Sequence, residues 1–187
     1  MNFSQAAENN KVPILEKLQQ HLSAGDQILE VGSGSGQHGL HFAQSMPQIT
    51  WQPTDQGDYF PGLKHNINLA ELPNVRAPHY LDLSSPKWPG PCNVLYCANV
   101  IHIMSETLLP KIFESACDLL LIYGPYKYDG EFTSDSNARF DLWLKDHNLD
   151  SGIRDIEVLK QHAERHGYQL ISDTPMPANN QFLVLKR

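Results

Sequence analysis

Three glycines at alternate positions form the segment of this sequence with the clearest chemical potential. Gly32, Gly34 and Gly36 follow an apolar segment, residues 27–31, and precede residues 37–45, which have helical character. Glycine lets a backbone approach a ligand closely, and the helix that follows points its free N–H groups at that ligand. Glycine-rich turns also serve as plain connections, so the loop gains meaning only together with its neighbours.

Acidic residues stand at the ends of three successive predicted strands. Glu30 precedes the glycine loop, Asp55 ends a strand expected over residues 49–54, and Asp82 follows a strand expected near residues 79–81. Parallel strands meet with their carboxyl ends at one edge of a sheet, where Asp55 is placed to accept ribose hydroxyls. A single aspartate is more often a cap or a solvated side chain, but three acids at one edge favour a nucleoside site.

The loop departs from the dinucleotide-binding pattern. Gln37 occupies the place of that pattern's third glycine, and Glu30 would oppose a diphosphate, whereas it suits a ligand with an ammonium group and a sulfonium. Tyr123 and Lys127 have the spacing of short-chain dehydrogenases, but Gly-Pro at residues 124–125 prevents the helix that would align them. A nicotinamide-dependent dehydrogenase is therefore the weaker interpretation.

Strands and helices alternate along the part of the chain that must position these residues. Strands are expected over residues 27–31, 49–54, 79–81, 93–98, 119–123, 168–172 and 181–186, and helices from Pro13 onward, over 37–45, around 63–70, near 107–117 and around 140–144. Such alternation predicts βαβ units, and the last two strands, with no helix between them, predict an antiparallel hairpin. We expect a doubly wound α/β fold with a seven-stranded, mainly parallel sheet.

The length of 187 residues fits a single domain over residues 1–187. Within it, residues 1–25 are expected to form an N-terminal helical cap. Residues 124–152 form a polar, turn-rich connection, which in a compact domain is typical of a lid or a substrate-binding insertion.

Composition narrows the classes of partner. The chain has no apolar run of 18 residues, which argues against a membrane span, and its net charge of −7 argues against a nucleic-acid partner. Three cysteines without a Cys-x-x-Cys pair and a start without a secretory signal indicate a cytoplasmic protein. His38 and His41, like His162 and His166, have helical spacing but no further ligands, so we expect exposed or helix-end histidines and no metal site.

These motifs resemble those of a known superfamily. Residues 28–36 resemble motif I of the class I S-adenosylmethionine-dependent methyltransferases, Asp55 and residues 82–83 fall where the next two motifs lie, and residues 99–103 are similar to the stretch after strand four in the small-molecule branch. Residues 8–15, 51–55, 123–126 and 176–180 further resemble a small family that includes methyltransferase-like protein twenty-six. Cys117-Asp118 departs from the superfamily's usual Lys-Pro-Gly-Gly turn before strand five.

The resemblance implies S-adenosylmethionine as cofactor and assigns roles to individual residues. Glu30 would hold the methionine amino group, Asp55 the ribose hydroxyls, and Asp82 with Leu83 the adenine. The other implied cofactor contacts are Gly32, Ser33, Gly34, Gly36 and Asn99.

The acceptor side is inferred from topology. His102, three residues beyond Asn99, is the candidate general base, because an oxygen or nitrogen acceptor often needs a proton removed. A histidine that only shapes the pocket remains an equal alternative. Candidates for the acceptor pocket are Tyr123, Tyr126, Asn179 and Asn180. The two asparagines are also suited to a turn, and we slightly favour the turn interpretation for them.

The expected function is methyl transfer to an acceptor that is most simply a small molecule. Two alternatives stay open: a cofactor-binding scaffold or sensor without turnover, and a protein methyltransferase. The acceptor, the methylated atom and the oligomeric state are not encoded in any motif of the sequence.

Overall fold

A computed structural model describes residues 3–187, and the chain forms two compact units, Met1–Tyr96 and Cys97–Arg187. Seven strands hydrogen-bond in the order β3-β2-β1-β4-β5-β9-β8. Strand β1 is parallel to β2 and β2 to β3, whereas β9 is antiparallel to both β5 and β8. The predicted seven-stranded, mainly parallel sheet with an antiparallel C-terminal hairpin is therefore confirmed.

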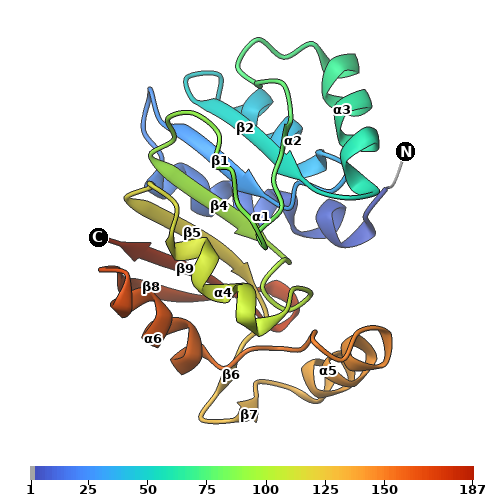
Figure 1. The fold of residues 1–187 in the computed structure, drawn as a ribbon, viewed down its shortest axis with the longest axis vertical. Helices are drawn as coiled ribbons and strands as arrows, with labels where there is room; N and C mark the ends of the chain where they lie inside the picture. Colours follow the sequence, from blue (N-terminus) through green and yellow to red (C-terminus); the bar gives the residue numbers. More distant parts are fainter. Residues whose placement is uncertain (1–2) are drawn as a thin grey trace. The chain divides into compact units, whose positions relative to one another are not determined.

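The first unit alternates helices and strands (Figure 1). Its elements are α1 (Gln5–His21), β1 (Gln27–Val31), α2 (Gln37–Ser45), β2 (Thr50–Asp55), α3 (Tyr59–Ala70) and β3 (His79–Tyr80), with β4 (Val94–Ala98) beginning near its end. Nearly every residue of β1 and β2 is buried, which is typical of strands covered on both faces. Both strands run directly into the segments that carry the acidic residues.

Helix α1 begins earlier than the sequence predicted. Ser4 is its N-cap, with Oγ accepting a hydrogen bond from the Ala7 N–H at 3.2 Å, and Pro13 lies inside the helix rather than in its first turn. The buried positions Asn10, Ile14 and Leu18 are four residues apart, so one face of the helix packs inward across the proline. An apolar pattern alone misses the first turns because the position before Ile14 on this face is a polar Asn10.

His38 is the second residue of α2, a helix-end position as the sequence predicted, and it is buried rather than exposed; its side chain is 7% exposed. Its Nε2 lies 2.7 Å from Asn10 Oδ1, and its Nδ1 lies 3.2 Å from the hydroxyl of Tyr96. Asn10 Oδ1 can only accept, so Nε2 carries the proton and Nδ1 accepts from Tyr96. The histidine thus joins α1, α2 and β4 through a satisfied polar contact in the core.

Burial lowers the pKa of His38 from 6.5 to about 4. The unfolded chain therefore binds a proton below pH 6.5 that the folded chain accepts only near pH 4, so stability falls as pH falls through that window. We expect the free energy of unfolding to drop by on the order of 3 kcal/mol more in the wild type than in His38→Phe between these pH values. Urea titrations at stepped pH measure this, and His65→Phe, which alters an exposed position of α3, should keep the wild-type slope.

The second unit contains the C-terminal hairpin and the segment after β5. Its elements are η1 (Glu106–Leu108), α4 (Leu109–Phe113), β5 (Leu119–Gly124), β6 (Lys127–Tyr128), β7 (Glu131–Phe132), α5 (Asp135–His147), α6 (Ile156–Arg165), β8 (Gln169–Met176), η2 (Pro177–Asn179) and β9 (Asn180–Lys186). Residues 124–152, expected to hold one short helix, contain the two-stranded hairpin β6–β7 and the 13-residue helix α5 (Figure 1).

Two boundaries in this unit differ from the sequence prediction. The helix expected near residues 107–117 is shortened to α4, and Tyr168 donates its hydroxyl to the Cys117 carbonyl at 2.5 Å where the chain turns into β5. Strand β8 extends to Met176, four residues beyond the predicted end, and includes Pro175. The proline is tolerated because β8 is an edge strand.

None of the helices in residues 3–187 combines the length and the apolar character needed to cross a membrane. In the same part of the chain, no group of three or more His, Cys, Asp and Glu side chains is arranged to hold a metal ion.

Candidate functional site

The glycine loop between β1 and α2 depends on left-handed backbone conformations. Gly32, Gly34 and Gly36 have φ angles of 71°, 57° and 85°. The Ser33 N–H donates to the Thr54 carbonyl at 2.8 Å, and the Gly36 N–H donates to the Ser33 carbonyl at the same distance. Residues with a Cβ rarely adopt these angles, so the turn requires the three glycines.

The glycines of this loop face different surroundings. A Cβ on Gly36 would lie 3.1 Å from methyl groups of Leu63 and Ile67, so this residue allows α3 to pack against the loop. A Cβ on Gly34 would meet nothing within 4 Å. The surroundings of Gly34, unlike those of Gly36, therefore leave room for a ligand to approach the backbone.

Asp55 at the end of β2 is tied to the glycine loop. Its Oδ2 accepts a hydrogen bond from the Gly34 N–H at 2.6 Å, and its Oδ1 accepts one from the Gln56 N–H at 2.7 Å. Burial raises the pKa of this carboxyl above its usual value, and the two backbone N–H donors oppose that rise. A carboxylate oxygen accepts more than one hydrogen bond, so Asp55 retains capacity for ligand hydroxyls.

Glu30 is almost completely buried, with 2% of its surface exposed. Its Oε2 accepts from Ser33 Oγ at 2.7 Å and from Trp51 Nε1 at 2.9 Å. Burial raises the pKa of Glu30 to about 7, and the charge of Asp55 adds to the rise, while the two donors lower it. The structure thus brings Glu30, Ser33, Gly34 and Asp55 together around one loop.

Asp82 and Leu83 follow β3, which pairs with the end of β2. The Leu81 N–H donates to the Asp55 carbonyl at 3.0 Å, so the residue just before this turn is hydrogen-bonded to Asp55. Asp82 Oδ1 accepts from the Ser84 N–H at 2.8 Å, and this contact and the Ser84 hydroxyl lower the pKa of the carboxyl. Leu83 is buried. In this structure Asp82 therefore stabilises its own turn, and its contact with adenine stays a prediction.

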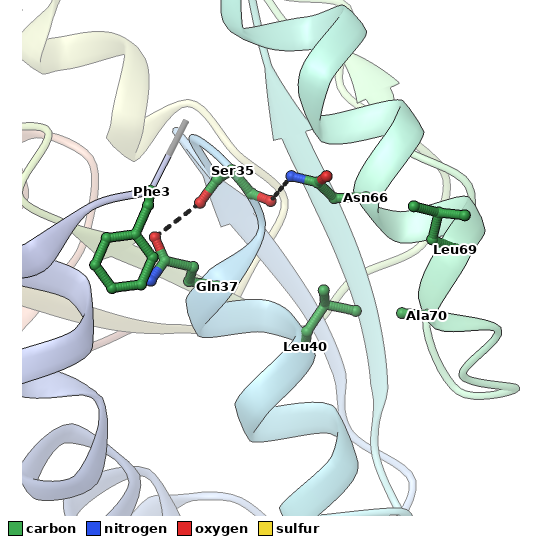
Figure 2. A pocket seen from close by; sticks show the side chains of 7 residues that line it. All are labelled: Phe3, Ser35, Gln37, Leu40, Asn66, Leu69 and Ala70. Carbon is green, nitrogen blue, oxygen red and sulfur yellow. Dashed lines mark hydrogen bonds between the residues drawn. The ribbon is translucent and has the colours of Figure 1, made fainter. Parts of the chain in front are cut away.

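A pocket of about 220 Å3 adjoins the glycine loop in the first unit. Figure 2 shows Ser35, Gln37 and Leu40 on one side and residues of α3 on the other, with the Asn66 amide donating to the Ser35 carbonyl at 2.9 Å. The remaining lining residues are Phe3, Leu69 and Ala70. Ligand pockets usually measure about 300–1,000 Å3, so this one accommodates only part of a larger molecule. Apart from Ser35, which belongs to the glycine loop, no sequence motif pointed to its walls, because they are single side chains scattered over α2, α3 and Phe3.

Asn99 and His102 lie in the second unit, after β4. Asn99 has a φ angle of 58°, and its N–H donates to the Tyr123 carbonyl at 2.9 Å. Such an angle is uncommon outside glycine and marks a constrained position. His102 is 5% exposed, and burial lowers its pKa to about 4, helped by the charge of Arg154. The imidazole is therefore neutral at pH 7 and available as a proton acceptor.

The loop that carries His102 is held by the segment before α6. The Gly152 N–H donates to the His102 carbonyl at 2.8 Å, Ser151 Oγ donates to the Ile103 carbonyl at 3.0 Å, and Arg154 Nη2 donates to the Met104 carbonyl at 2.6 Å. Three successive carbonyls are thus fixed by residues 151–154. His102 also contacts Phe140 of α5, with ring centroids 5.3 Å apart.

Tyr123 and Tyr126 are both buried, with exposures of 2% and 1%. Within residues 3–187 the Tyr126 hydroxyl has no hydrogen-bond partner, and burial raises its pKa well above its usual value. A buried, unsatisfied hydroxyl is uncommon and calls for a donor or acceptor from elsewhere. Contact of these tyrosines with an acceptor molecule stays a prediction.

Asn179 and Asn180 form the turn between β8 and β9. Asn179 has a φ angle of 56°, its carbonyl accepts from the Asn137 amide at 3.0 Å, and its own amide donates to Ser136 Oγ at 3.2 Å. The Asn180 amide donates to the Pro177 carbonyl at 3.1 Å. These contacts serve the turn and the start of α5, in line with the turn interpretation.

Comparison with solved structures places the fold among methyltransferases. The S-adenosylmethionine-dependent methyltransferase SibL is 18% identical, with a TM-score of 0.77 over 97% of this chain and 55% of that chain. An O-methyltransferase family 2 protein from Planctomyces limnophilus, in complex with apigenin, is 16% identical, with a TM-score of 0.77 over 97% and 60%. The mitomycin 7-O-methyltransferase MmcR is 14% identical, with a TM-score of 0.78 over 97% and 55%.

The chain spans little more than half the length of these three structures. At identities this low the likeness shows the fold alone, a Rossmann-like fold that this chain shares with these methyltransferases. A family model described as "Protein of unknown function (DUF938)" matches residues 1–187. Because this match covers the whole sequence, the chain belongs to the DUF938 family.

Proposed function

We propose that the protein is an S-adenosylmethionine-dependent methyltransferase that acts on a small molecule. The observation that carries this proposal is the arrangement around the glycine loop, where two buried carboxylates from adjacent parallel strands bind the same loop. Buried acids suit a cationic nucleoside and oppose a diphosphate. The methyltransferase names of the structural neighbours support the same class, as does the resemblance to the family of methyltransferase-like protein twenty-six.

The residues present fit the cofactor in charge and hydrogen-bonding capacity. S-adenosylmethionine, when bound, supplies the methyl group of its sulfonium. In this proposal Glu30 accepts from the ammonium group, Asp55 accepts from the ribose hydroxyls, and the glycine loop allows close backbone approach. Asp82 and Leu83 border the adenine. The proposed contacts with the methionine and ribose are completed by Gly32, Ser33, Gly34, Gly36 and Asn99.

His102 is the proposed general base, and Tyr123, Tyr126, Asn179 and Asn180 are the proposed acceptor-binding residues. The lowered pKa of His102 keeps its imidazole in the neutral form that can accept a proton at pH 7, and it also makes the imidazole a weaker base than a free histidine. Alignment of acceptor and methyl group supplies most of the remaining rate enhancement. The acceptor class we favour is a hydroxylated aromatic molecule, because one structural neighbour was solved with apigenin.

Isothermal titration calorimetry with S-adenosylhomocysteine tests the cofactor, and turnover with methyl-labelled S-adenosylmethionine against apigenin and a metabolite extract tests the reaction. Saturable binding and a labelled small-molecule product are expected. Binding of NADH in place of the nucleoside thioether would contradict the proposal. Cofactor binding without any labelled product would favour a scaffold or sensor, and label on protein would favour a protein methyltransferase.

Substitution of His102 tests the base. We expect His102→Asn to lower product formation by about 100-fold, in the range usual for loss of a general base, and to leave S-adenosylhomocysteine affinity unchanged. Near-normal turnover of the variant at every pH would show that His102 only shapes its surroundings. Phe140→Leu alters the ring that contacts His102 and keeps the imidazole. It therefore separates the effect of packing around His102 from the effect of losing the proton acceptor.

Residues 124–152 are proposed as a lid or substrate insertion, and residues 1–25 as a helical cap on the cofactor half. We expect amide hydrogen exchange in β6, β7 and α5 to slow when S-adenosylhomocysteine and an acceptor are added. Residues 151–154 should exchange slowly throughout, because they already bond to the loop after β4. Unchanged exchange over residues 124–148 would contradict a lid.

A further inference from the structure

One oxygen of the Glu30 carboxylate is fully engaged inside the protein. Trp51 Nε1 donates to Oε2 at 2.9 Å and Ser33 Oγ donates to the same atom at 2.7 Å. Both donors bind the same atom, Oε2, and neither of them binds the other oxygen, Oε1. A nearly buried carboxylate that is held through one oxygen by two donors presents its other oxygen to a further donor in a fixed direction.

Trp51 is itself firmly held. Its side chain is fully buried, and its ring lies 5.6 Å from the ring centroids of both Phe42 and Tyr96. A Cβ on Gly39 of α2 would lie 2.6 Å from Trp51 Nε1 and 2.8 Å from Glu30 Oε2. The absence of a side chain at Gly39 is therefore what allows α2 to close over the indole–carboxylate contact.

We infer that Trp51 is a positioning residue for cofactor binding: its indole N–H holds Oε2 of Glu30 so that Oε1 receives the ammonium group of the cofactor's amino-acid part. The inference rests on the proposed function and deepens it, since Trp51 itself does not touch the cofactor. No motif of the sequence assigns a role to this residue.

The charges around Glu30 determine how loss of the indole would act. The pKa of Glu30 is raised to about 7 in total: burial is the main cause and the Asp55 charge adds to the rise, whereas the donors Trp51 and Ser33 oppose it. Gly39 contributes no charge from α2. Removal of the indole N–H leaves the carboxyl more readily protonated, and a protonated carboxyl binds an ammonium group poorly. Cofactor affinity in such a variant should fail at a higher pH than in the wild type.

Trp51→Phe tests this with two ligands. S-adenosylhomocysteine carries the ammonium group, whereas 5′-methylthioadenosine has the same nucleoside and a thioether but no amino acid. Calorimetry between pH 5.5 and pH 8.5 is expected to show at least a tenfold loss of S-adenosylhomocysteine affinity in the variant at pH 7. The pH at which this affinity is half lost should rise by about one unit, and 5′-methylthioadenosine affinity should stay unchanged.

Two further variants guard against a general loss of structure. Phe42→Leu perturbs the packing on Trp51 without removing a donor to Glu30, so the ratio of the two affinities should stay at the wild-type value. Ser33→Ala removes the second donor to Oε2 and should shift the pH profile in the same direction, even if Trp51→Phe does not fold. Equal weakening of both ligands by Trp51→Phe, or no shift of the profile, overturns the inference. A wild-type protein that binds neither ligand overturns the proposed function instead.

Discussion

Asp55→Ala should lower the affinity for S-adenosylhomocysteine by roughly 100- to 20,000-fold. The proposed role of Asp55 is to accept both ribose hydroxyls, and each hydrogen bond to a charged group contributes about 1.5–3 kcal/mol. Loss of both, at about 1.4 kcal/mol per factor of ten, gives the expected range. The change also frees the Gly34 N–H, which donates to Asp55 at 2.6 Å, so the loop loses its anchor at the same time. Isothermal titration calorimetry measures the effect directly.

The variant Asp55→Asn separates charge from loop anchoring. Its amide oxygen can still accept from the Gly34 N–H, while the amide nitrogen replaces the oxygen that accepts from the Gln56 N–H. The loop contact is kept and the ionic part of the ribose contact is lost, so an intermediate affinity is expected. Asp58→Ala alters an exposed aspartate three residues away and should leave binding unchanged. Wild-type affinity in Asp55→Ala would remove this residue from the cofactor site and leave it as a structural acceptor for the loop.

The strand–loop–helix unit around Gly32 could be predicted from the sequence because its signals are local. An apolar strand, alternate glycines and a helical pattern occupy successive positions, and each constrains only its own backbone. The position of Asp55 beside this loop follows from the parallel pairing of β1 with β2. The strand-end placement of Glu30 and Asp55 is therefore available without a structure, as is the C-terminal hairpin.

Polar residues in the core were beyond this kind of prediction. A hydrophobic pattern counts Asn10 and His38 as surface positions, yet they bond each other inside the first unit. Such contacts depend on how two helices far apart in the sequence pack, and neither partner carries a local signal. The same reason hides Trp51, whose large apolar ring predicts burial but not a hydrogen bond to Glu30.

The effect of Gly39 on stability could not be predicted from the sequence either. A glycine inside a helix usually destabilises that helix. Replacement by alanine would ordinarily stabilise a helix by about 0.5–1 kcal/mol. Here the added Cβ would lie 2.6 Å from Trp51 Nε1 and 2.9 Å from Trp51 Cδ1, closer than a Cβ can approach. We expect Gly39→Ala to destabilise the protein by about 1–3 kcal/mol, the usual cost of overpacking a core.

The matched control is Gly62→Ala, since Gly62 also lies inside a helix, α3, and a Cβ there would meet nothing within 4 Å. Thermal unfolding should move the two variants in opposite directions, because 1 kcal/mol corresponds to about 2–4 °C for a chain of this size. Gly39→Ala should also weaken S-adenosylhomocysteine binding, since the new methyl group displaces the Glu30 carboxylate. If both variants raised the thermal unfolding midpoint alike, α2 would have room to move away from Trp51. Close packing against Trp51 and Glu30 would then not require glycine at position 39.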